Sequence, residues 1–418
     1  MPEKDRERLR GLARLWMEIS EGPRMEERKI LWGRLHGLKG ARPMVLIEPM
    51  YMRDFVKEGE LSCEDPYMRR VERYMLENIV HAEELGDDIV VEPFFRIGWS
   101  MELPSFGLDI RKIKSENSDV AYVFEQAIKT PQDIEKLEKR DFIVDKDLTG
   151  RRKERLESIF GDILPVRVAN YDFMDADEDG FYEWVGTCFF GLTWQLHQLL
   201  GLENIMYWFY DHPEGMHALM RYMVDDRLAM FGALEREGCL ASNSDNQMAG
   251  PRFYGYCDDF PYFEGPAKMD RLWAWCESQE STCISAPMFE EFVLPYLKQL
   301  SDRFGMIYYG CCETVSDRLD IIKKAIPNMR AVSVSMWNDF DIVGDLIGKG
   351  LVYSRKPAPM YISGKNPDWD GVAKDIDLTI KSAKGCNLEF LMRDVYDIDG
   401  DRGRIARWVQ EVRKRCDY

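Results

Sequence analysis

The sequence contains no apolar run that approaches the roughly 20 residues needed to span a membrane as a helix. Its first eight residues, MPEKDRER, are densely charged, which argues against a secretory signal. Positive charge is scarce, because 56 Lys and Arg stand against 74 Asp and Glu, for a formal net charge of −18. Proteins that follow a nucleic-acid backbone need clustered positive charge. We therefore expect a soluble, cytoplasmic protein, compatible with a homodimer, that binds neither membrane nor nucleic acid.

Histidine and phosphate-binding motifs are scarce as well. The sequence has only five histidines, all in or beside predicted helices, so we expect structural roles for them. No glycine-rich loop of the kinds that hold ATP or NAD phosphates occurs, and neither ligand is expected. The ten cysteines are irregularly spaced. Without a secretory signal they are read as reduced thiols rather than as a disulfide framework.

The sequence does contain short apolar runs that alternate with longer helical patterns, and 45% of its residues are apolar. Helices are predicted at 4–20 and 25–37, followed by an extended lead-in segment, Arg42–Glu48. Eight strand candidates come next, each followed by a helix-compatible stretch: Asp88–Glu92, Leu164–Val168, Cys239–Ser242, Leu272–Trp275, Met306–Tyr309, Ala331–Ser335, Leu351–Ser354 and Leu388–Met392. This pattern predicts one α/β domain over 1–418, a (β/α)₈ TIM barrel with an N-terminal helical extension at 1–40.

A long insertion is predicted after the second of these strands, over residues 170–238. It contains three helical patterns, at Glu183–Leu200, Glu203–Tyr210 and Pro213–Glu237. A break at Asp211–Pro213 separates the last two, because proline suits the first turn of a helix and not its interior. We expect this helical insertion to fold over one rim of the barrel.

Catalytic groups of a TIM barrel follow the C-terminal ends of its strands. The strand Met306–Tyr309 ends in a glycine, two adjacent cysteines and an acid, Glu313, an arrangement that can present soft metal ligands at the mouth of a pocket. Adjacent cysteines are more often buried small hydrophobes, and only the position at the rim favours metal binding. The other candidates near strand ends are Glu92, Arg96, Trp99, Asn170, Asp245, Glu280, Ser335, Trp337, Arg355, Lys356, Arg393 and Asp394.

Several motifs resemble the uroporphyrinogen decarboxylase and cobamide (corrinoid) methyltransferase superfamily. They are Glu280–Pro295, Tyr308–Glu313 and Ser333–Ser335, with weaker likeness at Gly201–Met206 and Asp211–Glu214. The resemblance covers about residues 160 to 418 and implies a single (β/α)₈ barrel. The arginine-bearing N-terminal signature of the decarboxylases has no counterpart, because the corresponding segment Arg42–Pro49 carries an acid instead.

The resemblance also implies a zinc site. The cobamide methyltransferases use a His-x-Cys at one strand end and another cysteine near the C-terminus. Here Tyr309 stands at the histidine position, Cys311 at the cysteine and Cys312 at the usual glycine. Cys386 has similar spacing but precedes its strand, so it is expected to lie far from the rim. The ligand set predicted in its place is Cys311, Cys312, Glu280 and Asp394.

The resulting leading hypothesis is a zinc-dependent methyltransferase that moves a methyl group between a small methylated substrate and a corrinoid (cobalamin) carried by a partner protein. Its predicted catalytic residues are Glu280, Glu313 and Tyr309. Its predicted substrate-binding residues are Glu92, Arg96, Trp99, Asn170, Asp245, Ser335, Trp337, Arg355, Lys356 and Arg393. Two alternatives stay open: a decarboxylase of a small or tetrapyrrole acid that uses Arg355, Lys356 and Arg393, and a non-catalytic barrel that binds a corrinoid or aromatic ligand.

Overall fold

Two amphipathic helices, α1 (Glu3–Ser20) and α2 (Pro23–His36), open the chain as the sequence predicts. The computed structural model describes residues 2–49, 52, 54–114, 122–170 and 188–417. In α1, the buried residues Leu9, Leu12 and Trp16 recur at helical spacing. They pack against α3 (Pro66–Val80), so the N-terminal helices belong to the body of the fold.

The centre of the fold is a parallel six-stranded sheet with the order β1-β14-β13-β12-β11-β10. A second parallel sheet pairs β2 (Phe95–Gly98) with β7 (Val166–Ala169). The large sheet joins the first and last strands of the chain, because Val45 lies opposite Phe390. Its strands are β1 (Met44–Ile47), β10 (Trp273–Cys276), β11 (Met306–Tyr309), β12 (Met329–Val334), β13 (Val352–Arg355) and β14 (Asn387–Met392).

Two of the predicted strands are wrong, and the segment predicted as an extended lead-in, Arg42–Glu48, contains the strand β1. Residues 88–92 are not a strand and run along α2, where the Trp32 Nε1 donates to the Asp88 carbonyl at 2.9 Å. Cys239–Ser242 forms only an isolated bridge, from Ala241 to Pro266. Both are short apolar runs, which periodicity alone cannot assign. The strands present instead are β2 and β1.

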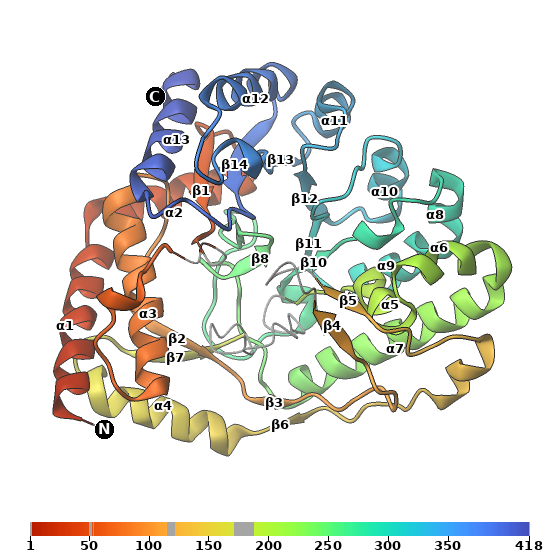
Figure 1. Cartoon of the computed structure of the whole chain (residues 1–418), viewed down its shortest axis with the longest axis horizontal. Coiled ribbons are helices and arrows are strands. Elements are labelled where there is room, and N and C mark those ends of the chain that lie inside the picture. The colour runs from red at the N-terminus through yellow and green to blue at the C-terminus, as the bar shows by residue number, and fades with distance from the viewer. Residues whose placement is uncertain (1, 50–51, 53, 115–121, 171–187, 418) are drawn as a thin grey trace.

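A helix or helices follow each parallel strand. Figure 1 shows these helices on the outside of the molecule, with the strands toward its middle. Besides α3 they are α4 (Lys146–Phe160), α5 (Leu192–Leu200), α6 (Leu202–Asp211), α7 (Pro213–Arg236), α8 (Ala286–Phe292), α9 (Leu294–Ser301), α10 (Leu319–Ala325), α11 (Phe340–Ile347), α12 (Trp369–Ser382) and α13 (Arg402–Arg415). None of the described helices is long and apolar enough to cross a membrane.

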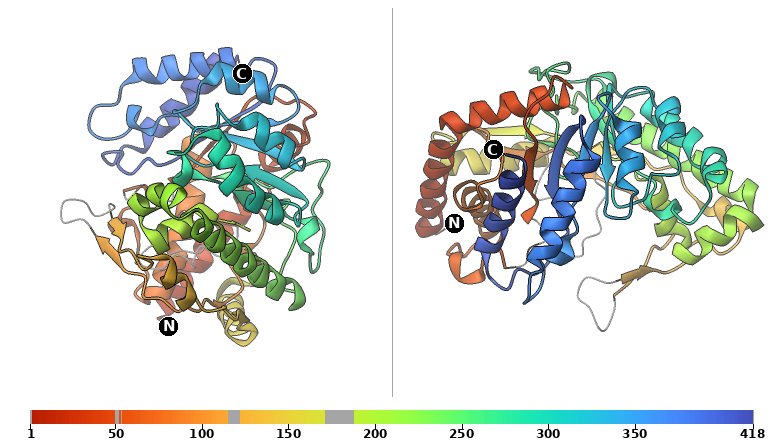
Figure 2. Two further views of the ribbon diagram at one scale, coloured as in Figure 1. Left: turned by 90° about the vertical axis from the view of Figure 1, so that its right-hand side faces the viewer. Right: turned by 90° about the horizontal axis from the view of Figure 1, so that it is seen from above.

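The second and third predicted insertion helices are present as α6 and α7. The first begins only at Leu192, as α5, because Phe189 pairs with Trp275 of β10, and residues 183–187 lie outside the described part of the chain. The sequence did not indicate a second excursion after β2. It contains two antiparallel pairs, β3 (Met101–Glu102) with β6 (Ile143–Val144) and β4 (Lys112–Lys114) with β5 (Tyr122–Phe124). Figure 2 shows the β4–β5 pair extending beyond the body of the chain. A short antiparallel pair, β8 (Met248–Gly250) and β9 (Phe253–Tyr254), follows α7.

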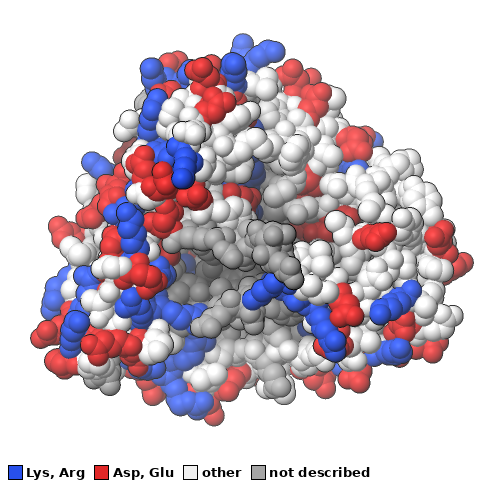
Figure 3. Space-filling model, in the orientation of Figure 1, with Lys and Arg blue, Asp and Glu red and all other residues white. Residues whose placement is uncertain are grey.

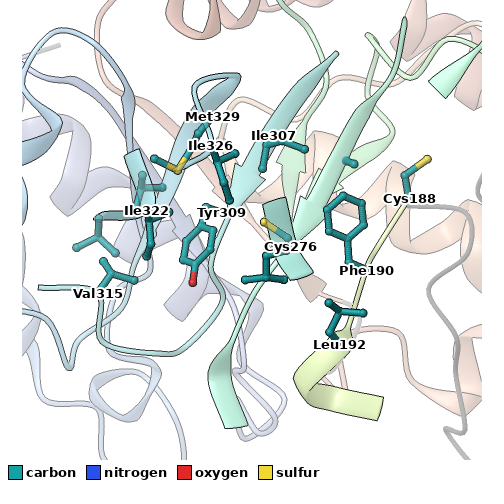
Figure 4. Packing of buried hydrophobic residues seen from close by; sticks show 14 of the residues in the cluster. Cys188, Phe190, Leu192, Cys276, Ile307, Tyr309, Val315, Ile322, Ile326 and Met329 are labelled. Atoms are coloured by element: carbon teal, nitrogen blue, oxygen red, sulfur yellow. The ribbon is translucent and has the colours of Figure 1, made fainter. Parts of the chain in front are cut away.

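Strand alternation divides the buried residues between two hydrophobic clusters. Ile307 and Tyr309 belong to the cluster that packs against the outer helices, together with Ile322 and Val315 (Figure 4). Tyr308, between them on β11, belongs to the other cluster, with Trp273. One strand therefore supplies both the helix layer and the interior.

Figure 3 shows Lys and Arg interspersed with Asp and Glu around the face seen in Figure 1.

The contact between α11 and α12 gives a test of this packing. A Cβ on Gly344 would lie 2.1 Å from the backbone oxygen of Ser382, so we expect Gly344→Ala to lower the free energy of unfolding by about 1–3 kcal/mol. The control is Gly11→Ala in α1, where a Cβ meets nothing within 4 Å. That change should be neutral or stabilising by up to about 1 kcal/mol. Urea unfolding of both variants measures the difference, and equal effects would contradict the packing of α11 on α12.

Candidate active site

A tightly held loop at the C-terminal end of β11 carries the two adjacent cysteines. Gly310 has a φ of 95° there, and a Cβ on it would lie 3.1 Å from the Ser333 Cβ. Its carbonyl accepts a hydrogen bond from Trp275 Nε1 at 3.0 Å, and the Cys311 carbonyl accepts one from Ser333 Oγ at 2.6 Å. Strands β10 and β12 therefore fix the loop from both sides.

The two thiols lie side by side, with their Sγ atoms 3.7 Å apart. The two thiols share one hydrogen bond, which lowers the pKa of Cys312 and raises that of Cys311. The Arg393 guanidinium, which follows β14, donates to the Cys311 sulfur at 3.7 Å. One thiol of the pair is thus more readily ionised than an isolated buried cysteine, which suits both nucleophilic attack and metal binding.

Glu313 holds the thiol loop rather than pointing at a ligand. Its two carboxylate oxygens accept from the backbone N–H groups of Ser278 at 2.9 Å and of Cys311 at 2.7 Å. The backbone N–H of Cys312 is bound in turn by Gln279 Oε1 at 3.2 Å. Burial raises the pKa of Glu313. The acid predicted as catalytic is therefore placed as a positioning residue.

Two more glutamates gather around Glu313 from the end of β10. Glu280 accepts from the Thr193 hydroxyl at 2.7 Å, and Glu277 accepts from the backbone N–H of Gln279 at 2.6 Å. Loss of hydration raises the pKa of Glu280 to about 7 and that of Glu277 well above its ordinary value. Glu280 is thus partly protonated near neutral pH, a property that general acids share.

A buried ion pair joins Arg393 to Glu48. Their Nε and Oε2 atoms are 3.2 Å apart, and Arg393 also lies 3.5 Å from Asp394. Glu48 directly follows β1, and its backbone N–H donates to the Met392 carbonyl at 2.9 Å. Burial raises the pKa of Glu48. Sequence reasoning missed this residue because β1 was not counted among the strands.

Lys356 lies in the interior below these groups. Its ammonium donates to the Tyr308 hydroxyl at 2.7 Å and to Ser354 Oγ at 2.8 Å, and burial lowers its pKa to about 7. Further in, His36 and Glu389 form a fully buried pair with 2.9 Å between Nε2 and Oε2. The interior of the sheet is therefore polar at this point.

A cavity of about 350 Å³ adjoins Glu48. Arginines, tyrosines and acids form most of its wall. The lining residues are Glu48, Pro49, Arg70, Arg73, Tyr74, Glu77, Asn78, His81, Arg96, Asn246, Gln247, Met248, Arg252 and Tyr254. Of the residues predicted to bind substrate, Arg96 is the one that lines it.

Three predicted site residues lie away from the thiol pair. Arg355 faces the outer helices, where its Nε donates to Thr379 Oγ1 at 3.0 Å and it pairs with Asp375. Tyr309 also faces outward, with its hydroxyl 2.7 Å from Ser278 Oγ. Both corrections follow from strand alternation, because their inward neighbours are Ser354 and Tyr308. Trp337 is 67% exposed.

The remaining predicted residues have local structural partners. Glu92 pairs with Lys29 at 2.6 Å, and Asp245 pairs with Arg96 at 2.9 Å. Asn170 bonds both backbone groups of Ala241. Ser335 donates to the Glu313 carbonyl at 3.2 Å, and Trp99 packs against the larger hydrophobic cluster.

The donor atoms fit half of a zinc site. Two thiolates on a tetrahedral zinc, each about 2.3 Å from it, lie about 3.8 Å apart, and the observed pair is separated by 3.7 Å. Among the described residues, however, no three His, Cys, Asp or Glu side chains gather closely enough to hold an ion. The predicted four-ligand set is thus not assembled, because Glu280 is bound by Thr193 and Asp394 by Arg393. Cys386 bonds the Gly344 carbonyl at 3.6 Å, away from the thiols as predicted.

Comparison with known proteins supports the fold. No protein-family model matches the sequence, and no curated protein matches it significantly. A methyltransferase from Methanosarcina mazei has a similar structure, with a TM-score of 0.51 and 10% sequence identity over 93% of this chain and 97% of that one. At so low an identity, the likeness shows a shared mixed α/β fold.

The thiol pair predicts a distinctive alkylation profile. In protein stripped of metal by a chelator, iodoacetamide should modify Cys312 at a lower pH than Cys283. Cys283 is an exposed residue, but partial loss of hydration of its thiol raises its pKa. Cys311→Ala removes the shared hydrogen bond and should raise the midpoint for Cys312 by about one pH unit. Mass spectrometry of the labelled peptides measures both midpoints. An unchanged midpoint in Cys311→Ala would show that the two thiols do not share a proton.

The glutamate group predicts a stability change with pH. A carboxyl whose pKa is raised to about 7 in the folded protein destabilises it as the pH rises from about 4.5 to 7, because only the unfolded chain ionises freely there. Glu280→Gln should therefore gain about 1–3 kcal/mol over the parent protein at pH 8 and little at pH 4.5. Thermal unfolding at both pH values tests this. An equal gain at both would mean that Glu280 is not a desolvated acid.

Proposed function

We propose that this protein is a methyltransferase that moves a methyl group between a small methylated substrate and a corrinoid carried by a separate protein. The observation that carries the proposal is the Cys311–Cys312 pair, with its lowered Cys312 pKa, at the C-terminal end of β11. The likeness in fold to a protein named a methyltransferase supports the same reaction class.

We further propose that the two parallel sheets close into one (β/α)₈ barrel. The six-stranded and two-stranded sheets together supply the strand number of that fold, and helices follow each strand. Helices α5 to α7 would then belong to the insertion over the rim that the sequence predicts for residues 170–238. In such a barrel Glu48, Cys311 and Arg393 all follow strand ends on the catalytic face.

The proposed reaction needs thiolate ligands for a metal and a source of one proton. The bond from the methyl carbon to oxygen, nitrogen or sulfur breaks with both electrons on that heteroatom, and the acceptor supplies the electron pair of the new bond to carbon. The departing heteroatom then takes up one proton. Glu280 can hold that proton near neutral pH because loss of hydration raises its pKa to about 7.

We propose zinc as the metal, held by Cys311 and Cys312. Thiolates select this ion over harder cations. Asp394 is the nearest further ligand, because its charge acts on the Cys312 thiol. When bound, zinc would act as a Lewis acid on a substrate heteroatom. The described residues supply only the two sulfurs at the required spacing, so two further ligands would have to come from a shifted Asp394 side chain, substrate or water.

One observation favours a second function, decarboxylation of a small acid. The cavity beside Glu48 has four arginines in its wall, and arginine forks bind carboxylates well. Release of carbon dioxide from an added acid, without methyl transfer, would establish this alternative. Binding of a corrinoid or aromatic ligand with no turnover of any kind would establish a non-catalytic barrel.

Metal analysis gives the direct test of the proposed function. Purified protein should hold about one zinc per chain, and Cys312→Ala should lose most of it because two of the ligands act together. Cys386→Ala, remote from the loop, is the matched control and should keep its zinc. The loaded protein should also methylate reduced free cobalamin, used in place of the partner, from a panel of methyl ethers, methylamines and methyl thioethers. Absence of both zinc and methyl transfer would overturn the proposal.

A further inference from the structure

The cavity beside Glu48 has a wall rich in positive charge. Arg70 and Arg73 come from α3, Arg96 comes from β2, and Arg252 comes from the turn between β8 and β9. Four arginines from three separate parts of the chain therefore face one space of about 350 Å³. Arginines that converge in this way are suited to planar anions.

Arg252 is held at the cavity in a strained backbone conformation. Its φ is 59°, in the left-handed region that non-glycine residues seldom adopt. Its Nε donates to the Ile47 carbonyl at 2.9 Å, which fixes the guanidinium plane. Among the described residues, none accepts a hydrogen bond from its two Nη atoms. Such strain at a wall residue is typical of a group held ready for a ligand.

Arg96 also has one buried N–H donor, at Nε, with no hydrogen-bond partner among the described residues. Its Nη2 is bound by Asp245 at 2.9 Å and by Asn246 at 2.8 Å, and its side chain is only 9% exposed. Its Nε is buried and has no hydrogen-bond partner. A buried unpaired donor costs free energy, and a bound anion would satisfy it.

The acids in the same wall oppose an anion only weakly. Burial raises the pKa of Glu77 to about 7 and raises that of Glu48 as well. Glu77 is thus partly protonated near neutral pH, and burial disfavours the charged form of Glu48. His81 also lines the cavity, with its Nε2 2.6 Å from Asp87, and burial lowers the pKa of this imidazole. Among the described residues of the wall, four guanidinium groups thus stand against two glutamates, both with raised pKa values.

We infer that this cavity binds a small organic compound through its carboxylate, with Arg252 and Arg96 as the anchoring residues. Tyr74 and Tyr254 also line the cavity, and aromatic side chains in its wall favour an aromatic or planar acid. The inference names the ligand class for the site of the proposed function, and it rests on that function only for the view that the ligand is the methyl donor.

The position of Glu48 connects this cavity to the thiol pair. Glu48 lines the cavity and lies 3.2 Å from Arg393 Nε, and Arg393 Nη1 is 3.7 Å from the Cys311 sulfur. Among the described residues, Glu48 and Arg393 therefore connect a ligand anchored at Arg252 to the sulfurs. Its end remote from the carboxylate is the part that would reach the thiols.

Calorimetry with a matched pair of probes tests the inference. Benzoate and benzamide have the same shape and differ in charge, so we expect full-length protein to bind benzoate at least about tenfold more tightly. Arg252→Gln should weaken benzoate binding about 10- to 100-fold and leave benzamide unchanged. Arg252→Lys keeps the charge and loses the fork, so its affinity should fall between the two. Arg415→Gln, at the last residue of α13, where the guanidinium pairs with Asp377, is the control and should bind as the parent does.

Three results would overturn the inference: equal affinity for benzoate and benzamide, no effect of Arg252→Gln, or inorganic phosphate that binds more tightly than any carboxylate. The last would show a phosphate site. Thermal unfolding of Arg252→Gln without ligand checks that the variant is folded. Benzoate binding as expected in a protein that transfers no methyl group would uphold the inference and overturn the proposed function, so the two fail separately.

Discussion

The alternation of side chains along the parallel strands is the constraint on which the rest of the molecule depends. Adjacent residues point to opposite faces, so Tyr309 enters the helix layer and Tyr308 enters the interior. The same rule sends Arg355 to Asp375 on α12 and leaves Ser354 beside Lys356. A shift of one residue on any of these strands would exchange core and site.

Buried charge is stabilised here by a small number of well-placed partners. Glu313 accepts two backbone N–H groups, which compensates for part of its lost hydration and also fixes the thiol loop. Glu277 accepts one backbone N–H and Glu280 one threonine hydroxyl, and the raised pKa values of both show the cost of burial. Desolvated acids beside two thiols lower the stability of the fold, and groups with such perturbed pKa values cluster at functional sites.

Much of the fold could be predicted from the sequence, and the reasons for the failures are local. Helices with a proline start or a clear apolar stripe, such as α1 and α7, were found, and β11 was placed at its observed bounds. The run at 88–92 was misread because the helices α1 and α2 bury it as a sheet would. The rule of strand ends found the thiols and Arg393. It could not find Arg70 or Arg73, because their position depends on how α3 is rotated against the sheet.

The pairing of β1 with β14 explains why residues so distant in sequence share one site. Ile47 lies opposite Met392, so the next residues, Glu48 and Arg393, emerge side by side. The positive charges of Arg393 and Arg252 lower the pKa of Glu48, whereas burial raises it and has the larger effect. An anion bound at Arg252 would compete with the Glu48 carboxylate for the same positive charge. Protonation of Glu48 and occupation of the cavity are therefore linked, and each changes how strongly Arg393 is drawn toward the Cys311 sulfur.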